Sequence, residues 1–148
     1  MLHEIGGVRQ DSQRGHRRWF QDDFFDLYIW QDEHGTPVAF QLCYARGIAE
    51  AVISWTAGGG FDHASVDGGE KPLRHAMAPL LRPGGMLPYF TVYGRLLAST
   101  AGWDPQLRVF LLEHLRDYRR VLLGVPRRPR RRALRTPRAC GPKGDPHR

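Results

Sequence analysis

Three consecutive segments of the chain alternate apolar side chains with other side chains, and only short turns separate them. They are Phe24–Gln31, Pro37–Tyr44 and Glu50–Thr56. Since side chains two residues apart point to the same face of a strand, this alternation predicts three β-strands. Strands joined by such short links run antiparallel, because a parallel pair needs a long crossover. The sequence therefore predicts an antiparallel meander, to which Met77–Leu81 would add a fourth, edge strand.

The alternation assigns the side chains of these strands to two different faces. The face expected to be covered is almost wholly apolar and carries Phe25, Leu27, Ile29, Val38, Phe40, Leu42, Tyr44, Ala51, Ile53 and Trp55. The opposite face is mixed and carries Asp26, Tyr28, Trp30, Ala39, Gln41, Cys43, Val52, Ser54 and Thr56. A mixed face is partly solvated, binds a ligand or contacts another subunit. Tyr28 and Trp30 are therefore ligand-binding candidates, and their rings could stack on bases or sugars, unless they only pack in a core or an interface.

Two helices are expected to follow. Pro88 suits a first helical position, and Gly102 can close the first helix. Asp104 is a preferred cap for the second. The expected apolar stripes are Phe90, Tyr93, Leu97 and Ala101 in the first helix and Leu107, Phe110, Leu111, Leu115 and Tyr118 in the second. The predicted fold class is α+β, an antiparallel meander of three to four strands packed on one face by two C-terminal helices.

Charge is distributed very unevenly along the chain. The whole chain has a formal net charge of +7, but residues 1–120 carry 13 Lys and Arg against 14 Asp and Glu. Residues 121–148 carry 9 Lys and Arg against a single acidic residue. We therefore expect a disordered leader over 1–16, a nearly neutral domain over 17–123 and a disordered Arg/Pro-rich tail over 124–148. A neutral domain lacks the electrostatic footprint typical of nucleic-acid-binding domains.

The tail itself is a candidate for contact with polyanions. Its arginines could bind phosphates non-specifically, with an affinity that falls steeply as salt rises. The candidate residues are Arg127, Arg128, Arg130, Arg131 and Arg132. The alternative is that the tail reflects composition alone and binds nothing.

The cysteines and the hydropathy of the chain bear on its location. The chain has two cysteines, Cys43 and Cys140, too few for a disulfide framework. No apolar stretch approaches the length that a membrane span needs. We therefore expect a cytoplasmic protein without a membrane span.

A group of reactive side chains falls in a glycine-rich stretch, 57–71, that is expected to be a loop. It consists of Asp62, His63, Asp67 and Glu70. Such residues could bind a ligand, serve as general acid and base, or hold a divalent metal. Their spacing matches no zinc-protease, EF-hand or phosphate-loop motif, so no metal or cofactor is expected. The simplest alternative is a solvated turn.

The core sequence also resembles a family of small uncharacterised bacterial proteins. The resemblance spans roughly residues 17–118 and rests on Arg18, Trp19, Phe20, Asp26, Leu27, Tyr28, Trp30, Phe40, Gln41, Leu42, Cys43, Tyr44, His63, Val66, Asp67, Gly69 and Glu70. The chain departs from the family pattern at Gly68 and Ala78. The resemblance implies that the leader and the basic tail lie outside the shared domain, and it transfers no catalytic residue.

The absence of a recognisable catalytic pattern favours a non-enzymatic binding or assembly module. A three-stranded sheet with two helices leaves one face and two edges uncovered, so a homodimer through the mixed face or an edge strand is expected. One alternative is a small metal- or anion-dependent enzyme that uses Asp62, His63, Asp67 and Glu70. A second alternative is a weak nucleic-acid binder that uses the basic tail.

Overall fold

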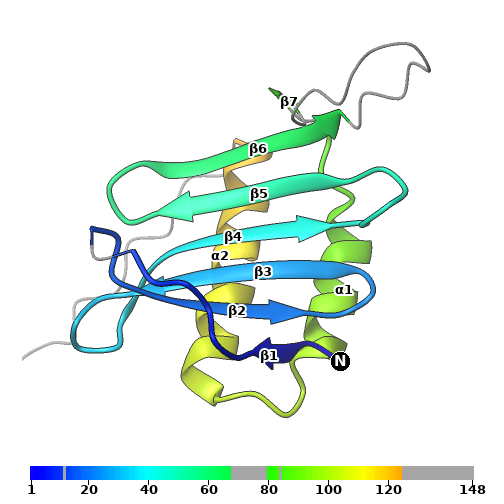
Figure 1. Ribbon diagram of the computed structural model, residues 1–148. Helices are drawn as coiled ribbons and strands as arrows, with labels where there is room; N and C mark the ends of the chain where they lie inside the picture. The colour runs from blue at the N-terminus through cyan, green and yellow to red at the C-terminus, as the bar shows by residue number, and fades with distance from the viewer. Residues whose placement is uncertain (12, 68–79, 84, 125–148) are drawn as a thin grey trace, which may run out of the picture.

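The computed structural model describes residues 1–11, 13–67, 80–83 and 85–124. One antiparallel sheet contains all the strands of this part of the chain, and each strand pairs with the next in sequence (Figure 1). The strands are β1 (His3–Ile5), β2 (His16–Gln21), β3 (Phe25–Gln31), β4 (Pro37–Tyr44), β5 (Ala51–Thr56), β6 (Gly60–Asp67) and β7 (Leu80–Pro83). The predicted meander is confirmed, and the α+β class is confirmed with it.

The predicted strand count of three to four is wrong, because further strands flank β3, β4 and β5 on both sides. β6 lies in the stretch expected to be a loop. Its residues alternate across the sheet in register with β5, with Phe61 opposite Trp55 and His63 opposite Ile53. Pairing with a strand already in place therefore outweighs the polar, glycine-flanked composition of this segment. The expected strand at 77–81 lies mostly outside the described residues, and β7 overlaps its end.

The N-terminal residues, which the sequence predicts to be a disordered leader, include a strand of the sheet. β1 pairs with β2, and Leu2 is buried in the core. The backbone N–H of Leu2 donates to the carbonyl of Ser99 at 3.2 Å. A bidentate pair between Glu4 and Arg18, at 2.8 and 2.7 Å, joins the side chains of these two strands. Burial of one leucine and pairing with β2 together hold the start of the chain against the domain.

Both helices, α1 (Tyr89–Ser99) and α2 (Pro105–Leu122), cover the same face of the sheet (Figure 1). The cap predicted for α2 is confirmed, because the Asp104 carboxylate accepts from the N–H groups of Gln106 and Leu107 at 3.1 and 3.0 Å. The predicted α2 stripe also faces the sheet, since four of its five members are buried and Phe110 packs against the core.

The stripe predicted for α1 is wrong except at Tyr93, which is partly buried against the core. The helix buries Val92 and Leu96, whereas Phe90 is 75% exposed and Leu97 39% exposed. Apolar residues occur on both sides of this helix, so two stripes of helical spacing compete, and docking against the sheet selects between them. The helix ends at Ser99, before Gly102, and the Thr100 hydroxyl donates to the Leu96 carbonyl at 2.7 Å.

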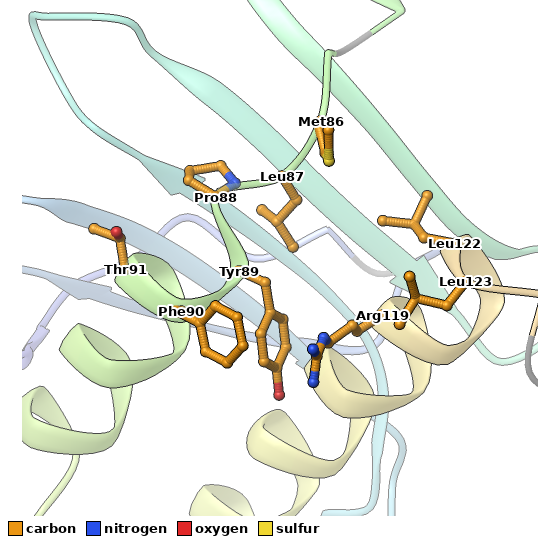
Figure 2. Close-up of a pocket in the computed structure, with 9 residues that line it drawn as sticks. All are labelled: Met86, Leu87, Pro88, Tyr89, Phe90, Thr91, Arg119, Leu122 and Leu123. Carbon is orange, nitrogen blue, oxygen red and sulfur yellow. The ribbon is translucent and has the colours of Figure 1, made fainter.

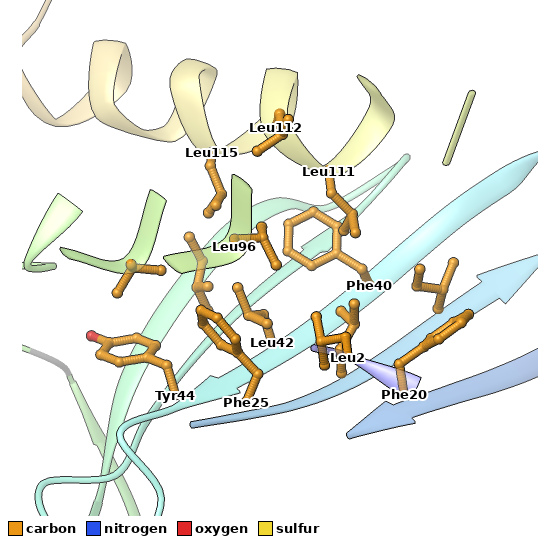
Figure 3. Close-up of a cluster of buried hydrophobic side chains, with 14 of the residues drawn as sticks. Leu2, Phe20, Phe25, Phe40, Leu42, Tyr44, Leu96, Leu111, Leu112 and Leu115 are labelled. Atoms are coloured by element: carbon orange, nitrogen blue, oxygen red, sulfur yellow. The ribbon is translucent and has the colours of Figure 1, made fainter. Parts of the chain in front are cut away.

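The core lies between the two helices and the apolar face predicted from the alternation (Figure 3). The largest fully buried side chains are Phe25, Leu27, Ile29, Phe40, Leu42, Ile53, Val92, Leu96, Leu111 and Leu115. Within the described residues, no helix is long and apolar enough to cross a membrane. The other face of the sheet, called the open face below, has no described helix over it (Figure 1).

Candidate binding site on the open face of the sheet

The open face gains aromatic and cationic side chains from β2. In the register of β2 and β3, Arg17 lies opposite Trp30 and Trp19 lies opposite Tyr28. Since residues opposite each other share a face, these four side chains gather on the open face. Tyr28 and Trp30 lie on the face predicted from the alternation. β2 is not predicted from the sequence, so the arginine adjacent to them is not predicted either.

Trp19, Tyr28 and Trp30 form an aromatic cluster on this face. The ring centroids of Trp19 and Tyr28 are 5.7 Å apart with 15° between their planes, and those of Tyr28 and Trp30 are 6.2 Å apart. The Trp19 indole N–H donates to the Asp26 carboxylate, which fixes one end of the cluster. The Arg17 guanidinium carbon lies 5.7 Å from the centre of the Tyr28 ring, within the range of a cation–π contact. The cluster is thus a packed, oriented group of rings.

A hollow of about 460 Å³ lies beside this cluster. Ala39, Ser54 and Thr56 are small side chains that lie next to one another on β4 and β5. Trp30 rises beside them from β3, and Arg14 reaches in from the segment before β2. The hollow exists because small residues form its floor while a large ring forms one wall.

Polar groups around the hollow are of several kinds. Gln41 contributes an amide, Ser54 and Thr56 contribute hydroxyls, and Arg14 contributes an exposed guanidinium. The Gln41 amide nitrogen contacts the weak acceptor Sγ of Cys43 at 3.8 Å. Burial, as the largest cause, raises the pKa of the Cys43 thiol. A reactive thiolate is therefore disfavoured on this face.

The predicted group in the glycine-rich stretch is not brought together where the structure describes it. Asp62 and His63 are neighbours in β6, so their side chains point to opposite faces of the sheet. Asp62 lies on the open face opposite Ser54, and His63 lies on the side of the helices. The side chain of Asp67 and the whole of Glu70 lie outside the part of the chain that the structure describes. The described residues contain no group of three His, Cys, Asp or Glu placed to hold a metal.

His63 is instead part of the packing between β4, β6 and α2. Its Nε2 lies 2.8 Å from the Tyr44 hydroxyl, and its ring lies 5.9 Å from that of Tyr118. Burial lowers the pKa of His63, and a backbone hydrogen bond to Gly85 acts in the opposite direction. The imidazole is therefore hydrogen-bonded both to the Tyr44 hydroxyl and to the backbone of Gly85. The polyanion candidates of the tail, Arg127 to Arg132, lie outside the described residues.

Comparison of the chain with family models, with curated proteins and with solved structures gives no match. The resemblance to a bacterial family over roughly residues 17–118 therefore stays a prediction. The aromatic cluster and the adjacent hollow are the features from which a function can be inferred.

Proposed function

We propose that the protein is a non-enzymatic binding module whose open face receives a small ligand with a flat ring and a negative charge. A nucleoside monophosphate combines these two features. The observation that supports this proposal most directly is the position of Trp30, which has Arg17 opposite it on β2 and shares the hollow with Arg14. The Arg17 guanidinium lies over the neighbouring Tyr28 ring, so Arg14 is the cation that shares the hollow with the Trp30 indole. An indole ring beside an arginine matches a flat ring that carries an anionic group.

The size and walls of the hollow suit such a ligand. Its volume of about 460 Å³ falls within the range of roughly 300–1,000 Å³ typical of small-molecule sites. Stacking of a base on an aromatic side chain contributes about 1–3 kcal/mol to binding. The Trp30 ring forms a wall of the hollow and is half-buried, so it is already oriented before the ligand arrives.

The remaining polar groups around the hollow can form hydrogen bonds with the edge of the ligand's ring. The Gln41 amide can both donate and accept hydrogen bonds, and so can the hydroxyls of Ser54 and Thr56. The Arg14 guanidinium is exposed and can approach a phosphate with two parallel N–H groups. Binding without chemistry is favoured because the thiol on this face, Cys43, has its pKa raised by burial.

Titration of the full-length protein with adenosine 5′-monophosphate, followed by calorimetry, tests the proposal. Trp30→Ala should weaken binding at least about fivefold, the loss expected for one stacked base. Arg14→Ala should weaken binding of the monophosphate but not of adenosine. Phe90→Ala is the matched control, because Phe90 is an exposed ring on α1 and distant from the hollow. If Trp30→Ala binds as the wild type does, or if none of the four common nucleoside monophosphates binds, the proposal is wrong.

A homodimer through the same face stays a prediction, and it would compete with the ligand for Trp30. Pairing through the β1 edge is less favoured, because β1 has only three residues and short edge strands resist association. Sedimentation velocity with and without adenosine 5′-monophosphate separates the two roles. A dimer that dissociates when the nucleotide binds would mean that both use the open face.

A further inference from the structure

Four large apolar side chains are exposed at the end of the molecule where α1 begins and α2 ends. Met86 is 92% exposed, Phe90 75%, Leu122 53% and Leu123 63%. All four line a groove of about 530 Å³, and we call them the helix-end patch (Figure 2). Scattered exposed apolar residues are ordinary, but a contiguous group around a groove marks an interaction surface.

The fold leaves these side chains exposed because their neighbours take the buried positions. Leu87 is buried between Met86 and α1, and α1 directs Val92 and Leu96 to the core. At the other side of the groove, α2 ends at Leu122, so its last apolar residues extend past the sheet-facing stripe. The helix-end patch is therefore free to contact an apolar partner without any rearrangement of the core.

Cationic groups accompany the patch. The Arg119 guanidinium carbon lies 4.9 Å from the centre of the Tyr89 ring and 4.8 Å from that of Phe90 (Figure 2). Arg116 lies over the Tyr93 ring at 5.4 Å, and Arg120 pairs with Asp117 at 3.3 Å. The C-terminal part of α2 is thus basic, and two of its arginines, Arg116 and Arg119, lie against aromatic rings.

The sequence adds more positive charge directly after the patch. Residues 125–148 carry 9 Lys and Arg against one acidic residue. Charge of this density close to an exposed apolar group favours an anionic, apolar partner. An apolar but uncharged partner would fill the groove without contacting the positive charge of the arginines.

We propose that the helix-end patch docks the protein on an anionic lipid bilayer. Phe90, Leu123 and the other patch side chains would enter the boundary between headgroups and acyl chains, and Arg119 would lie at the level of the phosphates. One such signal gives only marginal membrane binding, whereas an apolar anchor combined with a basic segment gives stable binding. The two signals lie together at this end of the chain.

A second copy of the protein is the main competing occupant, and the charges oppose it. A symmetric dimer places the same patch of both copies face to face. Arg116, Arg119 and Arg120 of the two copies would then approach one another. Each copy also carries a strongly basic sequence after residue 124. Like charges across an interface weaken association. An anionic bilayer satisfies both the apolar and the cationic parts of this surface.

The experiment measures partition of the full-length protein onto vesicles. Vesicles with about 30% phosphatidylserine in phosphatidylcholine should bind it, and pure phosphatidylcholine should bind it far more weakly. Phe90→Asp combined with Leu123→Asp should lower the partition coefficient at least about tenfold, because two apolar side chains no longer insert. Ile48→Asp is the matched control, since Ile48 is 91% exposed on the β4–β5 connection and does not line the groove. It should bind as the wild type does.

Two further measurements keep the result interpretable. Met86→Asp changes a side chain that is 92% exposed, so it should weaken partition without affecting thermal unfolding. Trp30→Ala should bind vesicles normally, which separates this proposal from ligand binding on the open face.

Unchanged partition of the Phe90→Asp, Leu123→Asp protein would assign the binding to the tail alone and overturn the proposal. Absence of wild-type binding at low salt would overturn it, as would a dimer that the double variant abolishes.

Discussion

The hydroxyl of Tyr44 lies 2.8 Å from Nε2 of His63, and the two rings are stacked with only 7° between their planes. Burial raises the pKa of Tyr44 to about 12, so the hydroxyl keeps its proton at neutral pH and can donate to the imidazole. Burial also lowers the pKa of His63. The pair joins β4 to β6 through a hydrogen bond that suits a neutral histidine.

This relationship predicts that acid weakens the fold. Because burial disfavours the charged imidazole in the folded state, the unfolded chain binds more protons once the pH falls below the ordinary histidine pKa of about 6.5. The free energy of unfolding should therefore fall as the pH drops through that value, and His63→Gln should reduce this fall. Thermal unfolding of both proteins across the pH range measures it. An equal fall in the two proteins would show that His63 is not the group responsible.

Substitution of two adjacent leucines tests which face of α1 is buried. Leu96 is fully buried and Leu97 is 39% exposed. Leu96→Ala should lower the free energy of unfolding by about 2–5 kcal/mol, because it leaves a cavity in the core. Leu97→Ala should cost much less, and urea unfolding measures both. Equal costs would mean that α1 packs with a different face against the sheet.

The sequence alone does not determine which face of α1 is buried. Alternation alone assigns Phe25 and Ile29 to the core and Tyr28 and Trp30 to the other face, because only one strand period fits them. In α1 two apolar stripes fit the helical period equally well, so only docking decides between them. A helix with one apolar stripe, such as α2, carries no such ambiguity.

The candidate site shows the same limit at a longer range. Trp30 is placed on the open face by its own strand, but the arginine opposite it depends on the register of β2, a strand with few apolar residues. The hollow depends on Ala39 and Thr56 being neighbours across β4 and β5. Adjacency between strands is a tertiary property, and no local pattern in the sequence states it.

The N-terminal cap of α2 should contribute measurably to stability. Asp104→Ala removes the carboxylate that accepts from two backbone N–H groups, and it should cost about 0.5–2 kcal/mol. Asp104→Ser keeps a side-chain acceptor at the same position and should recover most of this loss. Urea unfolding measures both variants. If the serine and alanine variants are equally destabilised, the cap is not the source of the effect.

Two glycines with a positive φ distinguish strain from steric overlap. Gly15 and Gly35 have φ of +80° and +79°, but only at Gly15 would an added Cβ overlap a backbone atom, the Gln31 carbonyl oxygen. Gly35→Ala should therefore cost about 1–2 kcal/mol from the left-handed conformation alone. Gly15→Ala should cost more, because β2 and β3 must also separate. A smaller loss at Gly15 in urea unfolding would contradict the described contact between the start of β2 and β3.

The most direct test of the proposed binding role is a map of where the ligand binds. Amide and indole resonances of the ¹⁵N-labelled full-length protein should be recorded by NMR during titration with adenosine 5′-monophosphate. The shifts are expected at the Trp30 indole and at the amides of Gln41, Ser54 and Thr56, with those of α1 and α2 unchanged. Shifts confined to the helices, or no shifts at millimolar nucleotide, would contradict a binding site on the open face.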